Sequence, residues 1–391
     1  MRGHRALVRI GLVSDTYLPQ VNGVTTVVRR SVALLRAQGH DVAVVAPRYP
    51  NFAGAAGERE LRVGSLPFPL YPEIRLSWPS FKRVAEFFDE FQPDLLHVHT
   101  EGALGVAGRR YALARKLPLV TSFHTNFPQY SRHYGVGFLE PAVWRWLERF
   151  HGPAALTLTP GEGVRDELVR RGITHAAVWG RGVDTRLFHP GRRDPGWRRW
   201  LAGGDDTAVV LHVGRLAREK NLDVLIAAWY TARDALGQRA TFVAAGEGPV
   251  ARDIEADLPF VRMLGFLPRQ HLATLYASAD LCVFPSHTET CGLVALEAMS
   301  SGVAVVAADA GGFRESIRHD VTGVLVPPSD VQRYAHAIIE LAVDPRRRFL
   351  LGSAARERAL ERDVEPENAE LLAHYAGLIG VTARRTATCA A

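Results

Sequence analysis

The sequence predicts an α/β protein made of two Rossmann-like domains that face a central cleft. In both halves of the chain, apolar strand-like runs alternate with glycine turns and amphipathic helices, which is the pattern of a doubly wound parallel sheet. A segment around 180–196 is rich in Gly, Pro and charged residues, as linkers are. The 391 residues are enough for two separate cores. We place the domains at 1–188 and 189–365, followed by a helix over 366–380 and a tail over 381–391.

The composition is ordinary for a soluble globular protein, with 47% hydrophobic and 23% charged residues. No apolar run approaches the roughly 18 residues that span a membrane. The basic N-terminus leads directly into a strand and lacks the small-residue cleavage site of a signal peptide. Cys282, Cys291 and Cys389 suit neither a disulfide framework nor a metal cage, and we expect Cys282 in the core. These features predict a cytoplasmic protein.

Charge is distributed unevenly along the chain. Residues 1–190 hold 24 Lys and Arg against 16 Asp and Glu, whereas the remainder holds 23 against 25. A basic half indicates an anionic partner, such as a membrane surface, an anionic lipid or nucleic acid. Arginine far outnumbers lysine throughout, however, and an arginine-rich genome explains the excess equally well. Both explanations stay open at this point.

The first domain is expected to begin with a strand over 9–15, a turn at Asn22-Gly23 and a helix that ends at Gly39. Amphipathic patterns predict helices over 81–91 and 138–150. The remaining strands are expected over 41–47, 61–70, 94–100, 117–124, 155–159 and 177–179. The first turn lacks the G-x-G-x-x-G fingerprint, so NAD binding is not supported.

Three histidines of the first domain lie on or at the end of predicted strands. His97 and His99 alternate on one strand and therefore share a face. No third metal ligand lies nearby in the sequence, so we expect no metal there. His124 ends the strand over 117–124, and the carboxyl ends of strands are where open α/β sheets bind ligands. Taken alone, such a histidine is more often structural than functional.

The second domain repeats the alternation from Thr207 onward. Strands are expected over 209–215, 241–245, 261–267, 280–284 and 303–307, with a last strand in GVLVPPSD. Helices are expected after Arg215, from Leu293, from 331 to about 361, and over 366–380, where Pro366 suits a first turn. Past Leu378 we expect disorder.

The candidate chemistry centres on residues 285–302, PSHTETCGLVALEAMSSG. A helix that opens beside Gly292, just after a strand, offers free N–H groups and a positive dipole end, which together suit phosphate. Glu289 and Glu297 frame this site, and carboxylates repel phosphate but accept hydrogen bonds from hydroxyl groups. Phosphate between hydroxyl-bearing groups describes a nucleotide sugar. Arg215 and Lys220 flank another strand-to-helix turn and could hold the phosphates.

This E-x7-E stretch, together with Gly292 and the following AMSSGVAVVAADAGGFRE, resembles the donor site of retaining glycosyltransferases of family 4, which have the GT-B fold. The resemblance covers roughly residues 8–380. It implies that Arg215 and Lys220 hold the two phosphates, that Gly23 approaches the diphosphate from the opposite domain, and that His124 faces the sugar. It also implies that the last helix packs back on the first domain. The implied catalytic residues are His124, Glu289, Arg215 and Lys220, and the implied donor-binding residues are Gly23, Arg215, Lys220, Phe266, Glu289, Gly292, Leu293, Val294 and Glu297.

The resemblance also implies a mechanism without a cofactor. No D-x-D motif is present, and the basic pair supplies the charge that a metal brings elsewhere. No convincing carboxylate nucleophile accompanies His124, so a double displacement is not supported. The family is described as reacting on one face of the sugar, with the leaving phosphate oxygen taking the acceptor proton. We therefore expect a metal-independent, retaining hexosyl transfer.

Within the family, TYLPQVNGV, HTNFPQY and WGRGVDTRLFHP resemble lipid-directed members. GDP-mannose is the favoured donor, and the acceptor is expected to be a lipid or a lipid-linked glycan. The alternatives are a UDP-hexose-dependent diacylglycerol glycosyltransferase and a non-catalytic nucleotide-binding protein on the same fold. We expect no nucleic acid partner. Arg29, Arg30 and the segment 144–149, with Trp144 and Trp146, suit contact with an anionic membrane at its inner face, although core packing of the tryptophans is an equal alternative.

Overall fold

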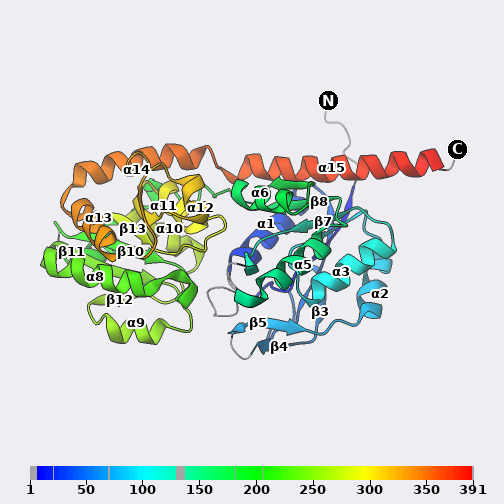
Figure 1. Ribbon diagram of the computed structural model, residues 1–391, viewed down its shortest axis with the longest axis horizontal. Coiled ribbons are helices and arrows are strands. Elements are labelled where there is room, and N and C mark those ends of the chain that lie inside the picture. The colour runs from blue at the N-terminus through cyan, green and yellow to red at the C-terminus, as the bar shows by residue number, and fades with distance from the viewer. Residues whose placement is uncertain are drawn as a thin grey trace. The chain divides into compact units, whose positions relative to one another are not determined.

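The computed structural model describes residues 7–20, 22–68, 71–128, 137–180, 182–204 and 206–389. The chain divides into two compact units, Met1–Gly180 with Glu367–Ala391, and Arg181–Pro366 (Figure 1). The first division falls eight residues before the predicted one, because Val183 pairs with Asp363 and Phe188 packs in a core of the second unit. The helix predicted over 366–380 belongs to the first unit from Glu367 onward.

The first unit contains a seven-stranded sheet, and all of its paired strands are parallel. In spatial order the strands are β3 (Arg59–Val63), β2 (Asp41–Pro47), β1 (Arg9–Val13), β6 (Leu95–Val98), β7 (Leu119–Ser122), β8 (Leu156–Thr159) and β9 (Ala176–Val178). One strand prediction was wrong. Residues 61–70 do not form a single strand, because Gly64 separates β3 from β4 (Ser65–Phe68), which pairs antiparallel with β5 (Tyr71–Ser77). Residues 69 and 70 lie outside the described part.

The helices of the first unit include α1 (Gly23–Ala37), α2 (Phe81–Phe91), α3 (Ala103–Ala114), α5 (Glu140–His151) and α6 (Glu162–Arg170). Asn22 caps α1 by accepting a hydrogen bond from the Thr25 N–H, at 2.8 Å. The sequence analysis did not predict α3. The last helix, α15 (Val364–Cys389), packs Leu371 and Tyr375 into the core of this unit beside β1 and β2. It continues beyond Leu378, where disorder was expected, and no Gly or Pro interrupts residues 381–389.

The second unit has a six-stranded parallel sheet. Its order is β12 (Val261–Met263), β11 (Ala240–Ala245), β10 (Ala208–Val213), β13 (Leu281–Phe284), β14 (Ala304–Ala308) and β15 (Val324–Val326). Helices α8 (Leu222–Leu236) and α13 (Val331–Val343) share one core with one face of this sheet. The other face shares a core with α7 (Pro195–Ala202), α10 (Arg269–Ser278), α11 (Leu293–Ser300), α12 (Gly311–Ser316) and α14 (Pro345–Leu360). The remaining helix is α9 (Ala251–Asp257).

Two further predictions can be compared with the second unit. The helix expected from 331 to 361 is two helices, because Asp344 ends α13 and caps α14 by accepting from the Arg347 N–H. Pro345 then occupies the first turn of α14. Cys282 is fully buried, so its predicted place in the core is confirmed.

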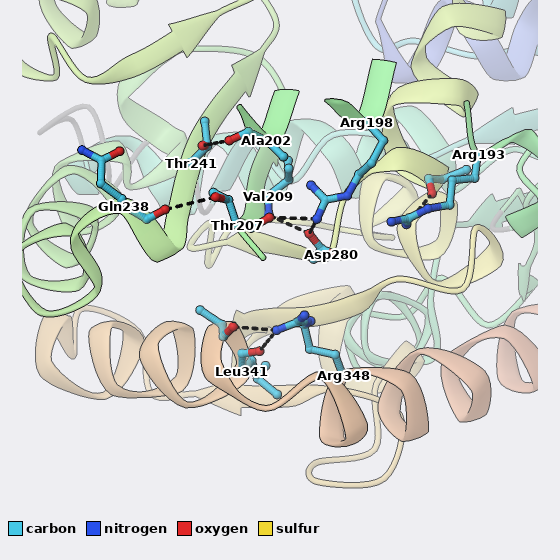
Figure 2. A network of polar contacts seen from close by, with 12 residues as sticks. Arg193, Arg198, Ala202, Thr207, Val209, Gln238, Thr241, Asp280, Leu341 and Arg348 are labelled. Atoms are coloured by element: carbon cyan, nitrogen blue, oxygen red, sulfur yellow. Dashed lines mark hydrogen bonds and ion pairs between the residues drawn. The ribbon is translucent and has the colours of Figure 1, made fainter. Parts of the chain in front are cut away.

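A polar network ties α7 to the amino ends of β10 and β13 (Figure 2). The Asp280 carboxylate accepts a hydrogen bond from the Val209 N–H at 2.7 Å and forms an ion pair with Arg198 at 2.8 Å. Arg198 also donates to the Thr207 carbonyl at 2.8 Å. This network holds α7 against the amino edge of the sheet. The loops of the candidate site lie at the opposite, carboxyl edge.

Candidate functional site

Two loops at the carboxyl edge of the second sheet bring together residues that are distant in the sequence. One follows β10 and contains Arg215 and Lys220, and the other follows β13 and contains Glu289. The Thr288 hydroxyl donates to the Glu219 carbonyl at 3.0 Å, between two residues that are both buried. Asn221, in the left-handed region with φ of 58°, donates to the Pro285 carbonyl at 3.5 Å. These bonds hold the two loops side by side.

The loops place Lys220 and Glu289 in direct contact. The Lys220 Nζ lies 2.5 Å from Glu289 Oε1, and each side chain is 18% exposed. Arg215 lies nearby in the same loop, with its Nη1 3.9 Å from Glu219 Oε1. The predicted donor residues Arg215, Lys220 and Glu289 therefore belong to one cluster. Their predicted roles toward phosphate and sugar stay predictions.

Gly292 and α11 follow shortly after Glu289 in the chain. Gly292 has φ of 70°, and a Cβ there would come within 2.7 Å of the Phe313 ring, so only glycine suits the position. No side chain caps α11, and the first backbone N–H groups of a helix, here those of Leu293 and Val294, have no partner within it. The next strand-to-helix turn packs closely against this loop, because Gly312 donates its N–H to the Glu289 carbonyl at 2.8 Å. The helix dipole adds positive potential beside Glu289 and Lys220.

Glu297 differs from Glu289 in its surroundings. It is buried, and the Arg269 Nη1 lies 3.3 Å from its Oε1. Burial raises the pKa of Glu297 to about 7, although Arg269 opposes this effect. The predicted pairing of both glutamates with the hydroxyl groups of a ligand stays a prediction, and the structure places a cation beside each. The sequence analysis missed Arg269, and its place after Pro268 at the start of α10 was the only signal.

Phe266 lies in the segment that follows β12 and is 49% exposed. Gly265 before it has φ of 62°, and the Gly265 carbonyl accepts a hydrogen bond from Gly246 N–H at 2.8 Å. The role of Phe266 as a donor-binding residue stays a prediction.

Gly23 and His124, the other predicted site residues, belong to the first unit. Gly23 begins α1, and a Cβ added there would meet no atom within 4 Å. Its φ is not in the left-handed region, so neither packing nor backbone geometry within the unit requires glycine. His124 follows β7, and its Nε2 lies 3.2 Å from His99 Nδ1. Burial lowers the pKa of His124 to about 4, so the ring is neutral at pH 7.

The three histidines near the carboxyl edge of the first sheet are in contact, which the sequence spacing did not reveal. The rings of His97 and His99 are 3.8 Å apart between centroids, which agrees with the predicted shared face. His97 is held by the Tyr375 hydroxyl at 2.6 Å and the Ser122 hydroxyl at 2.7 Å. Among the described residues, no group of three or more His, Cys, Asp or Glu has an arrangement that could hold a metal ion.

Asp15 is a further polar residue at this edge that the sequence analysis missed. Its carboxylate accepts hydrogen bonds from the Thr100 hydroxyl at 2.7 Å, the Leu104 N–H at 2.9 Å and the Gly105 N–H at 3.2 Å. Burial raises the pKa of Asp15, although these hydrogen bonds oppose the shift. Asp15 thereby stabilises the first turn of α3, and its signal in the sequence was its place just after β1.

Family models match both halves of the chain. The model described as Glycosyltransferase Family 4 matches residues 21–187, and the model described as Glycosyl transferases group 1 matches residues 207–344. A GDP-mannose-dependent alpha-mannosyltransferase of Mycolicibacterium smegmatis is 35% identical over 97% of this chain and 100% of its own length. Sulfoquinovosyl transferase SQD2 of Arabidopsis thaliana is 33% identical over 91% of this chain and 71% of its own length.

Solved structures are similar over nearly the whole chain. Sucrose-phosphate synthase from Thermosynechococcus elongatus has a TM-score of 0.76 and 22% identity, and covers 96% of this chain and 100% of its own. Anabaena Alr3699/HepE in complex with UDP and glucose has a TM-score of 0.74 and 21% identity, and covers 95% of this chain and 100% of its own. At this identity the likeness shows the fold alone, and the predicted fold class is confirmed.

Proposed function

The chain belongs to glycosyltransferase family 4, and from this premise we propose that it transfers mannose from GDP-mannose to a lipid or lipid-linked acceptor. Members of this family are nucleotide-sugar-dependent hexosyltransferases. Relatives named as GDP-mannose-dependent alpha-mannosyltransferases, at 32–35% identity, support this donor. The second candidate is the transfer of a hexose from a UDP-hexose to diacylglycerol. An alpha-monoglucosyldiacylglycerol synthase, 28% identical over 76% of this chain, supports the lipid acceptor of this candidate.

One observation carries the proposal: Lys220 and Glu289 are in contact beside the uncapped start of α11. An ammonium group and free N–H groups suit a diphosphate, and a carboxylate suits the hydroxyl groups of a hexose. The two needs of a nucleotide sugar are thus met within one cluster. Arg215 adds a second cation, whose side chain is one-third exposed.

The resemblance to retaining members of the family implies the following chemistry, which we adopt in this proposal. The bond between the anomeric carbon and the diphosphate oxygen breaks, and a bond to the acceptor hydroxyl oxygen forms on the same face, so the configuration is retained. The acceptor proton goes to the departing phosphate oxygen. Arg215 and Lys220 stabilise the negative charge that develops on the diphosphate, which is where preorganised cations lower a barrier most. Neutral His124 is suited to a hydrogen bond with a sugar hydroxyl.

A panel of nucleotide sugars tests this proposal. The purified chain is incubated with GDP-mannose, UDP-glucose and UDP-N-acetylglucosamine, with and without lipid acceptors, and nucleotide release is measured. We expect the fastest release with GDP-mannose and an α-linked product by NMR. A preference for a UDP-hexose would favour the second candidate, and no release from any donor would contradict the function. We expect activity to survive EDTA, and loss that Mg²⁺ restores would contradict the metal-independent mechanism.

We also propose that the first unit binds an anionic membrane surface, through residues that differ in part from those predicted. Trp144 is buried, with the Arg171 guanidinium 3.8 Å above its ring, and Arg30 pairs with Glu367 at 3.1 Å. Exposed apolar and basic residues at the start of α5 and along it include Phe138, Leu139, Arg145, Trp146 and Arg149. Phe138 is 79% exposed. Such a mixture suits a lipid headgroup region. No described helix is both long and apolar enough to cross a membrane.

Co-sedimentation with vesicles tests this surface. We expect binding to anionic vesicles that weakens as salt rises, because each basic residue near such a surface contributes on the order of 1 kcal/mol and is screened. Phe138→Ser with Trp146→Ser should reduce binding at all salt concentrations, whereas Phe349→Ser, on α14 of the second unit, is the exposed-aromatic control. Equal binding to neutral and anionic vesicles would contradict the proposal.

A further inference from the structure

His212 is a buried histidine at the carboxyl end of β10. It is 3% exposed and pairs in register with Ala244 of β11. Along β10, Val209, Leu211 and Val213 share one core, and Ala208 and Val210 the other. Because side chains alternate along a strand, His212 faces the side that α8 and α13 cover. Helix α8, which covers this face, begins at Leu222, two positions after Lys220 of the donor cluster.

The hydrogen bond of His212 determines which ring nitrogen carries the proton. Its Nδ1 lies 2.8 Å from the Val283 carbonyl oxygen. A carbonyl only accepts, so Nδ1 is the donor, and in the neutral ring Nε2 is an acceptor with a lone pair. Burial lowers the pKa of His212 to about 4, so the ring is neutral at pH 7. Among the described residues, the buried Nε2 has no hydrogen-bond partner.

This acceptor lies beside the loop that carries the donor cluster. Nε2 lies 3.5 Å from the point that a Cβ on Gly214 would occupy. Gly214 follows β10 and immediately precedes Arg215. Lys220 lowers and Glu289 raises the pKa of His212, so both charges lie close enough to act on the ring. A buried acceptor without a donor is unfavourable, and such atoms are normally paired when the protein binds its ligand or a water molecule.

We propose that His212 is a positioning residue of the donor site, whose Nε2 accepts a hydrogen bond from the Lys220 ammonium when a nucleotide sugar is bound. This inference rests on the proposed function. An ammonium group has three N–H donors, and without donor substrate the structure directs it to Glu289. When sugar hydroxyls occupy Glu289, a neutral acceptor holds the ammonium in place without competing with the diphosphate for its charge. A carboxylate in the position of His212 would compete.

Two substitutions separate this role from a purely structural one. In His212→Asn the amide nitrogen takes the place of Nδ1 and keeps the bond to Val283, but no acceptor remains at the position of Nε2. In His212→Gln the longer side chain places its amide oxygen near the position of Nε2, but the donor to Val283 is lost. A structural role through Val283 predicts that the Asn variant is the more active, and the proposed role predicts the reverse.

The readouts are kcat/KM for nucleotide-sugar turnover, affinity for GDP and UDP by calorimetry, and thermal unfolding. We expect His212→Asn to lower kcat/KM by roughly 10- to 100-fold and to weaken diphosphate binding, since the lost hydrogen bond involves a charged group. His212→Gln should stay within about threefold of the unmodified protein. In a Lys220→Ala background, His212→Asn should have no further effect, because the pair acts as a unit.

Wild-type activity in the Asn variant would overturn the inference, and so would equal losses in the Asn and Gln variants or an additive effect in the Lys220→Ala background. Failure of the proposed function gives a different pattern, in which the unmodified protein releases nucleotide from no donor and binds neither GDP nor UDP.

Discussion

At the carboxyl edge of the second sheet two glutamates each pair with a cation, whereas at the same edge of the first sheet three histidine rings lie in contact. Lys220 contacts Glu289 and Arg269 contacts Glu297 in the second unit. In the first unit, His99 contacts His124, and burial lowers the pKa of both. Both sheets are parallel and have similar topologies, so this difference comes from the loops and side chains at one edge.

Under the proposed function, this difference corresponds to separate roles of the two units toward the donor and the acceptor. Departing diphosphate carries negative charge, which cations and helix N–H groups stabilise. An acceptor or a hexose presents hydroxyl groups, for which a neutral imidazole is a suitable partner because it both donates and accepts. Charge in the second unit and neutrality in the first therefore match the two parts of the reaction. The predictions below test this contrast, from the largest expected effect to the smallest.

Glu289→Gln should give the largest effect, a fall in kcat of roughly a hundredfold or more with nucleotide binding retained. The carboxylate is expected to hold the sugar rather than the diphosphate, so its neutralisation affects the reacting part. Steady-state kinetics and GDP calorimetry measure the two quantities, with exposed Glu255→Gln on α9 as a control. Unchanged kcat with weaker nucleotide affinity would show that Glu289 does not have this role.

Arg215→Ala should weaken both nucleotide affinity and rate, by roughly 10- to 100-fold, because a charge-assisted hydrogen bond contributes about 1.5–3 kcal/mol. The same two measurements apply. Arg252→Ala, at an exposed position of α9, is the matched control and should change neither quantity. If affinity for GDP and UDP survives in Arg215→Ala, the assignment of this residue to phosphate is wrong.

Two glycine substitutions compare the units directly. Gly292→Ala should destabilise the second unit by about 1–3 kcal/mol, because its φ is 70° and a Cβ would meet Phe313. Gly23→Ala should leave stability unchanged, since nothing lies within 4 Å, but should lower turnover by roughly 10-fold if the donor approaches this turn. Urea unfolding and kinetics distinguish them. Full activity in Gly23→Ala would remove this residue from the donor site.

The smallest expected effect is the pH dependence of stability. The histidines of the first unit and Glu297 of the second unit should change stability with pH in opposite directions. Burial lowers the pKa of His97, His99 and His124, so between pH 6.5 and about 4 the unfolded chain binds more protons than the folded one. Stability of the first unit therefore falls as pH falls through this window. The pKa of Glu297 is raised from 4.5 to about 7, so its contribution is present at low pH and lost as pH rises through that range.

Hydrogen exchange of peptides from each unit at pH 7, 6 and 5 measures this contrast. Protection factors in β6 and β7, which correct for the slower intrinsic exchange at low pH, should fall at pH 5, and the His124→Gln variant should reduce that fall. In the second unit, Glu297→Gln should remove a stabilisation that increases toward pH 5. His212, whose pKa is lowered to about 4, contributes in the opposite direction in the variant and in the unmodified protein. An equal fall of the protection factors in both units would contradict the prediction.

Much of this molecule followed from the sequence alone. Alternating buried runs and glycine turns predicted the two parallel sheets, because periodicity reports which side of a strand or helix is buried. The carboxyl ends of parallel strands share one edge, so Arg215, Lys220 and Glu289 were expected to lie together, and they do. Gly292 was expected at a strand-to-helix turn for the same reason.

The tertiary structure alone decided which partner each of these side chains has. Lys220 and Glu289 are 69 residues apart, Arg269 and Glu297 are 28 apart, and His99 and His124 are 25 apart. The contact of Arg171 with the Trp144 ring and the unpaired nitrogen of His212 could not be read from the sequence either. Periodicity identifies a buried face but not the neighbour across it, because that neighbour depends on strand order and loop conformation, which many local sequences share.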